Sequence, residues 1–283
     1  MKKVTLVIVA VIFYSCEFVR SSGSDTPPEQ EPIIINVDSI IHTVHQIANL
    51  EFPYTENADD IISHTGFSFV FNDAHKQSDW VVYMLCRERI NNPVTKRKDN
   101  FRSDPAVKTG TATATDYKGS GYDRGHLVPS ADMLWSEVAM DESFFFSNMS
   151  PHLATFHQAG GIWYKLEDLV KIWAEAYDTL YIVAGPALKQ GIRGSIGKNN
   201  VSVPEYFYKV ILNYTGNRIE GIGFIMPHEK VKSGNPVRSY AVSIDSVQNF
   251  TGIDFFHRLP DIQREYVKNR LCDTCWIWEK PKK

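Results

Sequence analysis

The feature that most constrains the fold is an amphipathic helical pattern set among short apolar runs of strand length. Residues 162–176 (IWYKLEDLVKIWAEA) place large apolar side chains at steps of three and four, which predicts a helix with one buried face. Residues 80–86 (WVVYMLC) and 180–184 (LYIVA) are unbroken apolar runs, typical of strands buried on both faces. Residues 206–212 and 221–226 predict two more strands, joined by a turn rich in Asn and Gly.

Weaker patterns complete the predicted domain. Residues 65–72 alternate between apolar and polar side chains, which predicts a strand. Residues 93–121 contain Pro, Gly and many Thr and Asp, which predicts a long ordered loop, and residues 141–146 are expected to end a helix. Residues 237–248 are expected to form a last strand, and residues 261–271 a last helix. The sequence therefore predicts one α+β domain, built on a mixed, mainly antiparallel sheet with flanking helices.

The first residues predict export. An apolar run of about ten residues follows Met1-Lys2-Lys3, too short to span a bilayer of ~30 Å but typical of a signal-peptide core. Ser15 directly before Cys16 resembles a bacterial lipobox, although Tyr14 stands where a small residue is more usual. We therefore predict a lipoprotein signal peptide over residues 1–16, with Cys16 lipidated, a flexible tether and lead-in over 17–50, and a folded domain over 51–278. The predicted location is a membrane surface of a Gram-negative bacterium, periplasmic or outside the cell; a plain secretory signal is the alternative.

The remaining cysteines predict a disulfide. Cys272 and Cys275 form a single CxxC pair, which does not supply the four ligands of a structural zinc site. In an oxidising compartment we expect a disulfide there. Cys86 lies in an apolar run and is predicted to be a buried thiol, with a bond to the C-terminal pair as the alternative.

The charge is distributed unevenly along the chain. The net charge is −3, but residues 87–126 contain nine Lys or Arg and five acidic residues, a local net of +4. A basic segment on a mildly acidic body suits an enzyme that must release a polyanionic product better than a protein that coats DNA tightly.

Residues 119–126 (GSGYDRGH) carry the residue types that phosphodiester hydrolysis requires. Histidine is the natural base near neutral pH, and a fixed cation can neutralise a phosphate. Arg124 and His126 lie two residues apart, so on a strand both side chains face the same way. Gly125 between them leaves room for another group to approach the backbone closely, and Asp123 is placed to pair with a neighbouring base or to fix a loop.

Residues 122–126 (YDRGH) resemble the DRGH signature of the DNA/RNA non-specific endonucleases of the endonuclease G and Serratia type. The resemblance extends over residues 54–270. Further matching blocks are residues 99–105 (DNFRSDP), 147–151 (SNMSP), 163–167 (WYKLE), 203–210 (VPEYFYKV) and 251–256 (TGIDFF).

The resemblance implies a ββα-metal (His-Me finger) nuclease domain, in which two short strands and a helix hold one divalent ion. It places His126 as the general base, and Arg124 and Arg97 as residues that contact or stabilise the phosphate. Asn148 takes the position of an asparagine that supports the site, and Glu167 that of an acid that helps to hold the hydrated metal.

The resemblance also suggests nucleic-acid contacts beyond the reacting phosphate. Lys171 falls where some family members carry an arginine. The implied nucleic-acid-binding residues are Arg97, Arg102, Arg124 and Lys171.

The chain departs from the family pattern at the metal ligand. The family's glutamine position holds His152, which we expect to be a loop residue, and its ligand asparagine is replaced by His157. The spacing from there to Trp163 is about two residues longer than usual. Either His157 is the metal ligand, which would shift preference toward softer first-row metals, or Gln158 supplies an oxygen instead, or the site no longer binds metal. The first is favoured, because the other site residues are present.

We therefore expect a metal-dependent, sequence-non-specific endonuclease that hydrolyses DNA and RNA with Mg²⁺ or Mn²⁺, or a softer ion such as Zn²⁺. One alternative is a catalytically degenerate nucleic-acid-binding surface lipoprotein, and another is a hydrolase of small phosphodiesters. The expected partners are DNA, RNA, a membrane through the lipid anchor only, and a second copy in a homodimer. The histidines expected to be surface or packing residues are His42, His45, His64, His75 and His228.

Overall fold

The computed structural model describes residues 47–215, 218–230 and 236–279. The predicted signal peptide with Cys16, nearly all of the tether, and His42 and His45 lie outside the described residues. Leu50 is fully buried, so packed residues begin just before the expected boundary at Glu51. Within the described part of the chain, no helix is long and apolar enough to cross a membrane.

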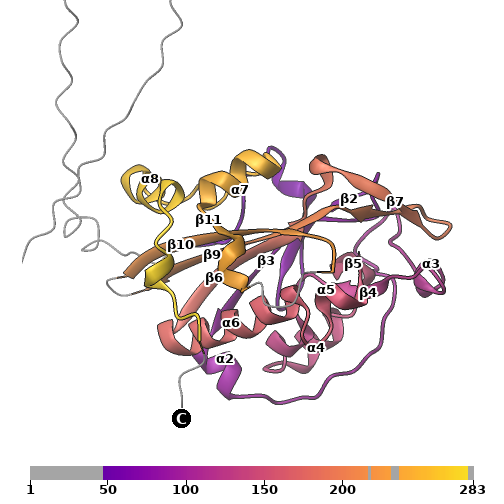
Figure 1. Ribbon diagram of the computed structural model, residues 1–283. Helices are drawn as coiled ribbons and strands as arrows, with labels where there is room; N and C mark the ends of the chain where they lie inside the picture. Colours follow the sequence, from indigo (N-terminus) through magenta and orange to yellow (C-terminus); the bar gives the residue numbers. More distant parts are fainter. Residues whose placement is uncertain (1–46, 216–217, 231–235, 280–283) are drawn as a thin grey trace, which may run out of the picture. The chain divides into compact units, whose positions relative to one another are not determined.

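A seven-stranded sheet forms the centre of the domain (Figure 1). Its strand order is β1-β2-β3-β6-β9-β10-β11, and every neighbouring pair is antiparallel. The strands are β1 (Ile61–Ser63), β2 (Ser68–Asn72), β3 (Gln77–Cys86), β6 (Thr179–Pro186), β9 (Tyr206–Thr215), β10 (Arg218–Pro227) and β11 (Ala241–Val242). The predicted mainly antiparallel sheet is confirmed, and β9 and β10 extend into the residues between the two predicted strands.

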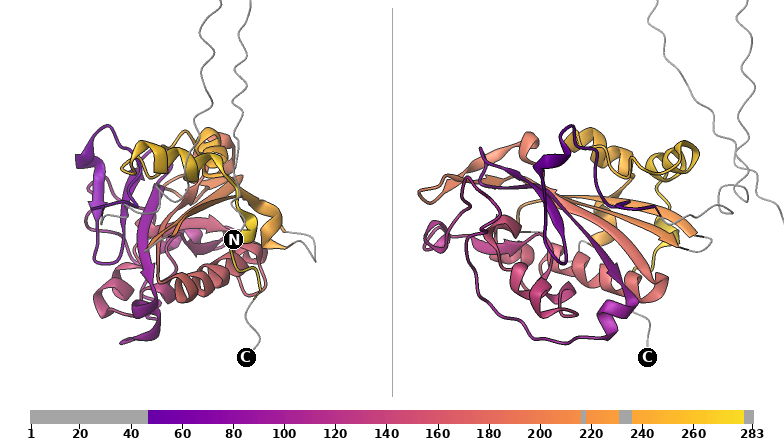
Figure 2. Two further views of the ribbon diagram at one scale, coloured as in Figure 1. Left: turned by 90° about the vertical axis from the view of Figure 1, so that its left-hand side faces the viewer. Right: turned by 180° about the vertical axis from the view of Figure 1, so that it is seen from behind.

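Helices cover both faces of this sheet (Figure 1, Figure 2). The long helix α6 lies on one face together with the shorter α2, α4 and α5, and α7 and α8 lie on the other. The helices are α2 (Arg87–Asn91), α3 (Ala114–Tyr117), α4 (Glu137–Glu142), α5 (Ala154–His157), α6 (Ile162–Tyr177), α7 (Ile244–Thr251) and α8 (Asp261–Asn269). Burial between the layers removes the apolar faces from water, which is the main stabilising contribution to such a fold.

Helix α6 confirms its predicted pattern. Its buried side chains include Trp163, Leu166 and Val170, at the three- and four-residue steps that place them on one face. The C-terminal segment packs behind the helix, with the ring of Trp276 4.7 Å from that of Trp173. These contacts fix the helix between the sheet and the chain terminus.

The cysteines follow the prediction in part. Cys272 and Cys275 form a disulfide with their Cα atoms 5.3 Å apart, as expected. Cys86 is a free thiol, but the prediction that it is buried is wrong, because it lies at the last position of β3 and is partly exposed.

The prediction of a last strand over residues 237–248 is largely wrong. Only Ala241–Val242 pair with β10, and the segment continues as helix α7. Ser243 caps that helix, because its side chain accepts a hydrogen bond from the backbone nitrogen of Ser246. Ile244 and Val247, three residues apart, are buried on one face of this helix. A short segment with this spacing of apolar residues is compatible with a helix as well as with a strand.

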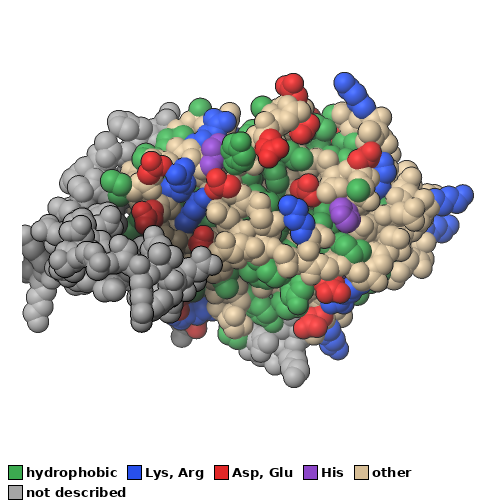
Figure 3. Space-filling model, turned by 90° about the horizontal axis from the view of Figure 1, so that it is seen from above, with side chains coloured by type: hydrophobic (Ala, Val, Ile, Leu, Met, Phe, Trp, Pro, Cys, Tyr) green, Lys and Arg blue, Asp and Glu red, His purple; other side chains and the backbone are tan. Residues whose placement is uncertain are grey.

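Two small hairpins lie apart from the main sheet. One pairs β4 (Asp123–His126) with β5 (Met149–His152), and the other pairs β7 (Ile192–Ile196) with β8 (Val201–Pro204). The predicted loop over residues 93–121 runs along the edge of the domain and contains only the short helix α3 (Figure 1). Lys and Arg side chains gather at the right-hand end of Figure 3, the end where β7 and α3 lie in Figure 1.

Candidate active site

Strand β4 of the β4–β5 hairpin carries Arg124 and His126 two residues apart, so both side chains lie on the same face of the strand. Arg124 pairs with Pro151 and His126 with Met149, and the chain continues from β5 into α5 and α6. A Cβ atom on Gly125 would lie 2.0 Å from Cγ of His152, so the imidazole ring packs directly on the glycine. The close approach predicted beside Gly125 is therefore confirmed, and a contact rather than an unusual backbone angle requires glycine there.

A cleft of about 530 Å³ opens beside this hairpin. It brings together three of the predicted site residues, Arg97, Arg124 and His157. Its other lining residues are Asp99, Phe101, Ala114, Tyr117, Lys118, Tyr122, Asp123 and Gln158. Several cations and a histidine therefore meet in one concave site, which is the kind of surface that an anionic group can enter.

His126 is not among the residues that line this cleft, but it packs on Phe101, which does. Its ring contacts the edges of Phe101, with centroids 5.6 Å apart, and Phe144, with centroids 5.0 Å apart. Its Nε2 atom is buried and has no hydrogen-bond partner among the described residues. Burial lowers the pKa of His126 to about 3, and the charges of Arg97, His157 and Arg124 lower it further in the same direction. The imidazole is therefore neutral near pH 7, with a nitrogen lone pair that is not already used.

Phe101 positions Arg124 and His126, while other residues hold Arg97. The guanidinium of Arg124 lies over its ring, 3.9 Å from the centroid, while His126 meets the same ring edge-on. Arg97 is held from the other side, because its Nη1 atom donates to Ser130 Oγ at 2.7 Å and its Nε atom to Asp99 at 2.7 Å. The side chain of Arg97 is 51% exposed, so it is positioned and still accessible.

His157, Gln158 and Asp123 meet at the cleft. The Nε2 atom of His157 lies 2.9 Å from Oδ2 of Asp123, and the side-chain amide of Gln158 donates to the same oxygen at 2.8 Å. The longer connection after β5 therefore leaves both candidate ligands beside one carboxylate of the DRGH segment. Both candidate metal ligands, His157 and Gln158, therefore contact the same carboxylate oxygen.

Asn148 acts from behind the hairpin. Its amide donates to the backbone oxygens of Val128 at 3.0 Å and Ser143 at 2.9 Å, and its Oδ1 atom accepts from the backbone nitrogen of Val128 at 2.9 Å. The side chain is fully buried. Asn148 thus fixes the chain that leaves β4 and does not line the cleft.

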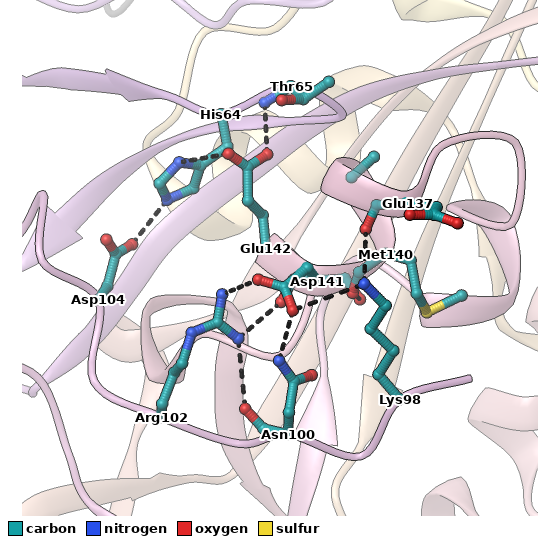
Figure 4. Close-up of polar contacts among 12 residues, drawn as sticks. His64, Thr65, Lys98, Asn100, Arg102, Asp104, Glu137, Met140, Asp141 and Glu142 are labelled. Carbon is teal, nitrogen blue, oxygen red and sulfur yellow. Dashed lines mark hydrogen bonds and ion pairs between the residues drawn. The ribbon is translucent and has the colours of Figure 1, made fainter. Parts of the chain in front are cut away.

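Arg102 does not line the cleft, and its side chain points toward Asp141 of helix α4 (Figure 4). Its Nη1 atom donates to the backbone oxygen of Asp141 at 2.9 Å, and its Nη2 atom pairs with the Asp141 carboxylate. The guanidinium also lies 4.1 Å from the centroid of the Phe145 ring. With these partners Arg102 fastens the long loop to the domain.

Glu167 and Lys171 belong to a separate buried polar cluster beneath α6. Glu167 lies 4.0 Å from Nζ of Lys209, while Lys171 lies 3.6 Å from Asp132, which also accepts from the Tyr83 hydroxyl at 3.3 Å. Burial raises the pKa of Glu167 to about 7, against the opposing charge of Lys209. Neither Glu167 nor Lys171 lines the cleft.

The expectation that His152 is a loop residue is wrong. His152 is the last residue of strand β5 and is fully buried. The centroid of its ring lies 4.4 Å from that of the Phe207 ring. Neither ring nitrogen has a hydrogen-bond partner among the described residues. His228 beside it is buried as a packing residue, as expected, and its Nε2 atom accepts from the backbone nitrogen of Leu153 at 2.7 Å.

These buried histidines predict a loss of stability in acid. Burial lowers the pKa of His152 well below its usual range and that of His228 to about 4. Below pH ~6.5 the unfolded chain therefore binds more protons than the folded chain, so stability falls with falling pH until the folded pKa is reached. As the pH falls, we expect the free energy of unfolding of His152→Leu to decrease less steeply than that of the wild type, by up to about 1.4 kcal/mol per pH unit. Urea denaturation between pH 7 and pH 4 measures this, and parallel curves for the two proteins would contradict it.

The hairpin with its histidine and arginine, followed by a helix beside an α+β sheet, defines the ββα-metal class of nuclease folds. Residues 45–262 match the family model of the DNA/RNA non-specific endonucleases. The chain belongs to this family of nucleases, and the predicted family and fold class are confirmed.

Individual relatives agree with this placement. The chain is 35% identical to human mitochondrial Endonuclease G over 187 residues, which is 62% of this chain and 62% of that protein, less than two thirds of its length. It is 30% identical to Nuclease C1 of Cunninghamella echinulata var. echinulata over 223 residues, 74% of this chain and 88% of that protein. A crystal structure of an EndoG/EndoGI complex aligns with a TM-score of 0.67 at 26% identity, covering 75% of this chain and 90% of the other.

Two residues of this region had not been identified from the sequence. Phe101 supports both Arg124 and His126, and no local pattern distinguishes it from a core aromatic residue. Lys209 did carry a signal, since it is the one charged residue in the apolar run YFYKVIL, and its side chain is fully buried. A charge inside a buried strand indicates a partner from elsewhere in the fold.

Proposed function

We propose that this protein is a metal-dependent endonuclease that hydrolyses DNA and RNA without sequence preference, with His126 as the general base. The observation that carries the proposal is the neutral imidazole of His126, packed against the cleft residue Phe101 beside the cleft arginines Arg97 and Arg124. A neutral imidazole can take a proton from water, and two guanidinium groups can hold the phosphate under attack. Cleft contacts to phosphate rather than to bases would give no sequence preference.

The same arginines connect substrate binding to the strength of the base. The positive charges of Arg97 and Arg124 both lower the pKa of His126. A bound phosphate would offset these charges, so the pKa of His126 would rise when substrate is present. We infer that the base becomes stronger in the complex than in the free protein.

The residues at the cleft fit a divalent metal. An imidazole nitrogen of His157 and the side-chain amide of Gln158 each lie within hydrogen-bond distance of the same carboxylate oxygen of Asp123. This mixed nitrogen and oxygen donor set suits first-row divalent ions such as Mn²⁺ or Zn²⁺ better than an all-oxygen set would. We propose that His157 holds the ion, and a bound ion there would stabilise the charge on the departing oxygen. Glu167 and Lys171, which lie on α6 and do not line the cleft, would support the site through their ion pairs with Lys209 and Asp132.

Metal titration tests the proposal. Purified full-length protein, stripped of metal, is expected to nick plasmid best with Mn²⁺ or a softer ion, because imidazole is a weaker ligand for Mg²⁺. His157→Asn is expected to move the preference toward Mg²⁺, with Gln158→Ala as the matched control that leaves the order of metals unchanged. A reversed result for the two variants would make Gln158 the ligand. DNA binding without cleavage by any metal would favour the degenerate binding protein.

We also propose that the protein is exported and held at a membrane by a lipid on Cys16. The short apolar run and the Ser15-Cys16 pair in the sequence support this. Such an anchor, with a polar tether, would hold the nuclease in water beside the membrane. Assembly as a homodimer stays a prediction.

A further inference from the structure

The β7–β8 hairpin and α3 form one continuous projection beside the cleft. We call residues 114–118 and 192–204 the basic arm. Its inner side is apolar and packs on the domain, with the ring of Tyr117 stacked 5.7 Å from that of Phe146 and with Ile196 and Val201 buried in the same cluster. The arm is therefore part of the folded domain and holds its outer side chains in fixed positions.

Asp116 locks the two parts of the arm together. Its carboxylate accepts hydrogen bonds from the backbone nitrogen of Asn199 at 3.0 Å, the side chain of Asn199 at 2.8 Å and the backbone nitrogen of Thr113 at 2.7 Å. Gly197 lies against the same residue, since a Cβ atom there would meet Oδ1 of Asp116 at 2.2 Å. The tip of the β7–β8 hairpin is thus joined to the end of α3.

The exposed charges of the arm are all positive. Lys118, Arg193 and Lys198 are exposed, while residues 192–204 contain no acidic residue and Asp116 is buried. The nearest acid along the chain, Glu205, is turned onto the backbone of Gly191 at the base of the hairpin. In Figure 3 blue side chains protrude at the extreme right-hand end, with no red side chain visible beside them.

The arm continues the wall of the cleft. Tyr117 and Lys118 line the cleft themselves. Arg193 and Lys198 belong to the β7–β8 hairpin, whose tip Asp116 joins to α3. The arm therefore carries an exposed cation in the cleft wall, Lys118, and two more on the attached hairpin, Arg193 and Lys198.

We propose that the basic arm binds the sugar-phosphate backbone of the nucleic acid outside the cleft, through Arg193 and Lys198. This inference rests on the proposed function, and it adds a second contact region that takes phosphates several nucleotides from the one being cut. A rigid, acid-free surface attracts polyanions, and each phosphate contact adds to the salt dependence of binding. The arm would raise affinity for a long chain without contacting the reacting groups.

Binding in EDTA tests the inference independently of cleavage. The affinity of full-length protein for a fluorescent 20-base-pair DNA duplex is measured by anisotropy over a range of salt concentrations. Arg193→Gln/Lys198→Gln is expected to weaken binding about tenfold and to make the slope of log K against log salt shallower by about one to two. The matched control is Lys165→Gln/Lys230→Gln, which removes two exposed cations elsewhere and is expected to change neither.

The outcomes separate the two proposals. Unchanged affinity and slope in the arm variant, with an unchanged melting temperature, would overturn the arm as a binding surface. An equal loss in the control variant would also overturn it, because the effect would then be one of total charge. Failure of the wild-type protein to cut plasmid with any metal would count against the proposed function and leave the binding comparison intact.

Discussion

Replacement of His126 by alanine is expected to lower the rate of plasmid cleavage by about 10²- to 10⁴-fold, the usual contribution of a general base. The His126 ring packs on the cleft residue Phe101, and its neutral state near pH 7 leaves a nitrogen lone pair available. DNA binding in EDTA is expected to stay close to that of the wild type, since Arg97 and Arg124 remain. Steady-state cleavage rates at saturating metal measure the loss.

His257→Ala is the matched control for this variant. His257 is a partly buried histidine near α7 and α8, remote from the cleft, and its ring packs 5.7 Å from that of Tyr54. We expect it to keep full activity. Full activity in His126→Ala, with an unchanged melting temperature, would show that another group is the base.

Replacement of Gly125 by alanine is expected to damage both stability and activity. The new Cβ atom would meet Cγ of His152 at 2.0 Å and Nδ1 at 2.1 Å, so either the ring or strand β4 must move. Forced packing of this kind costs about 1–3 kcal/mol, or roughly 2–12 °C in melting temperature for a domain of this size. Movement of β4 would also displace Arg124 and His126, and we expect a loss of activity of about 10²-fold.

A double-mutant cycle tests the cause. Removal of the ring in Gly125→Ala/His152→Ala is expected to recover part of the stability lost in Gly125→Ala, giving a favourable coupling between the two positions. If the losses of stability in the two single variants simply add in the double variant, the strain in Gly125→Ala does not come from its contact with His152. A melting temperature equal to that of the wild type in Gly125→Ala would contradict the contact itself.

Local sequence patterns predicted most of the fold because they report directly on one buried face. The steps of three and four in α6 and the unbroken apolar runs of β3 and β6 each describe how a short segment meets the core. The same reasoning failed for residues 237–248, where a strand was expected. A segment of that length fits either element, and the cap from Ser243 decides for the helix.

The sequence alone determined the family, the ββα class and the residue types of the site, because the DRGH segment and the blocks around it keep their order along the chain. Only the tertiary structure decided which side chains meet. Asp123 and His157 are 34 positions apart, and Glu167 and Lys209 are 42 apart, so no periodicity relates the members of either pair.

The same physical reason applies to the cations. The resemblance implied nucleic-acid contacts for both Arg97 and Arg102, but Arg97 lines the cleft whereas Arg102 is turned into α4 by Asp141, a residue of another element. The sequence predicts whether a side chain is charged, and it does not predict which partner will hold it. That choice depends on contacts between segments distant in sequence, which exist only once the sheet and its helices have packed.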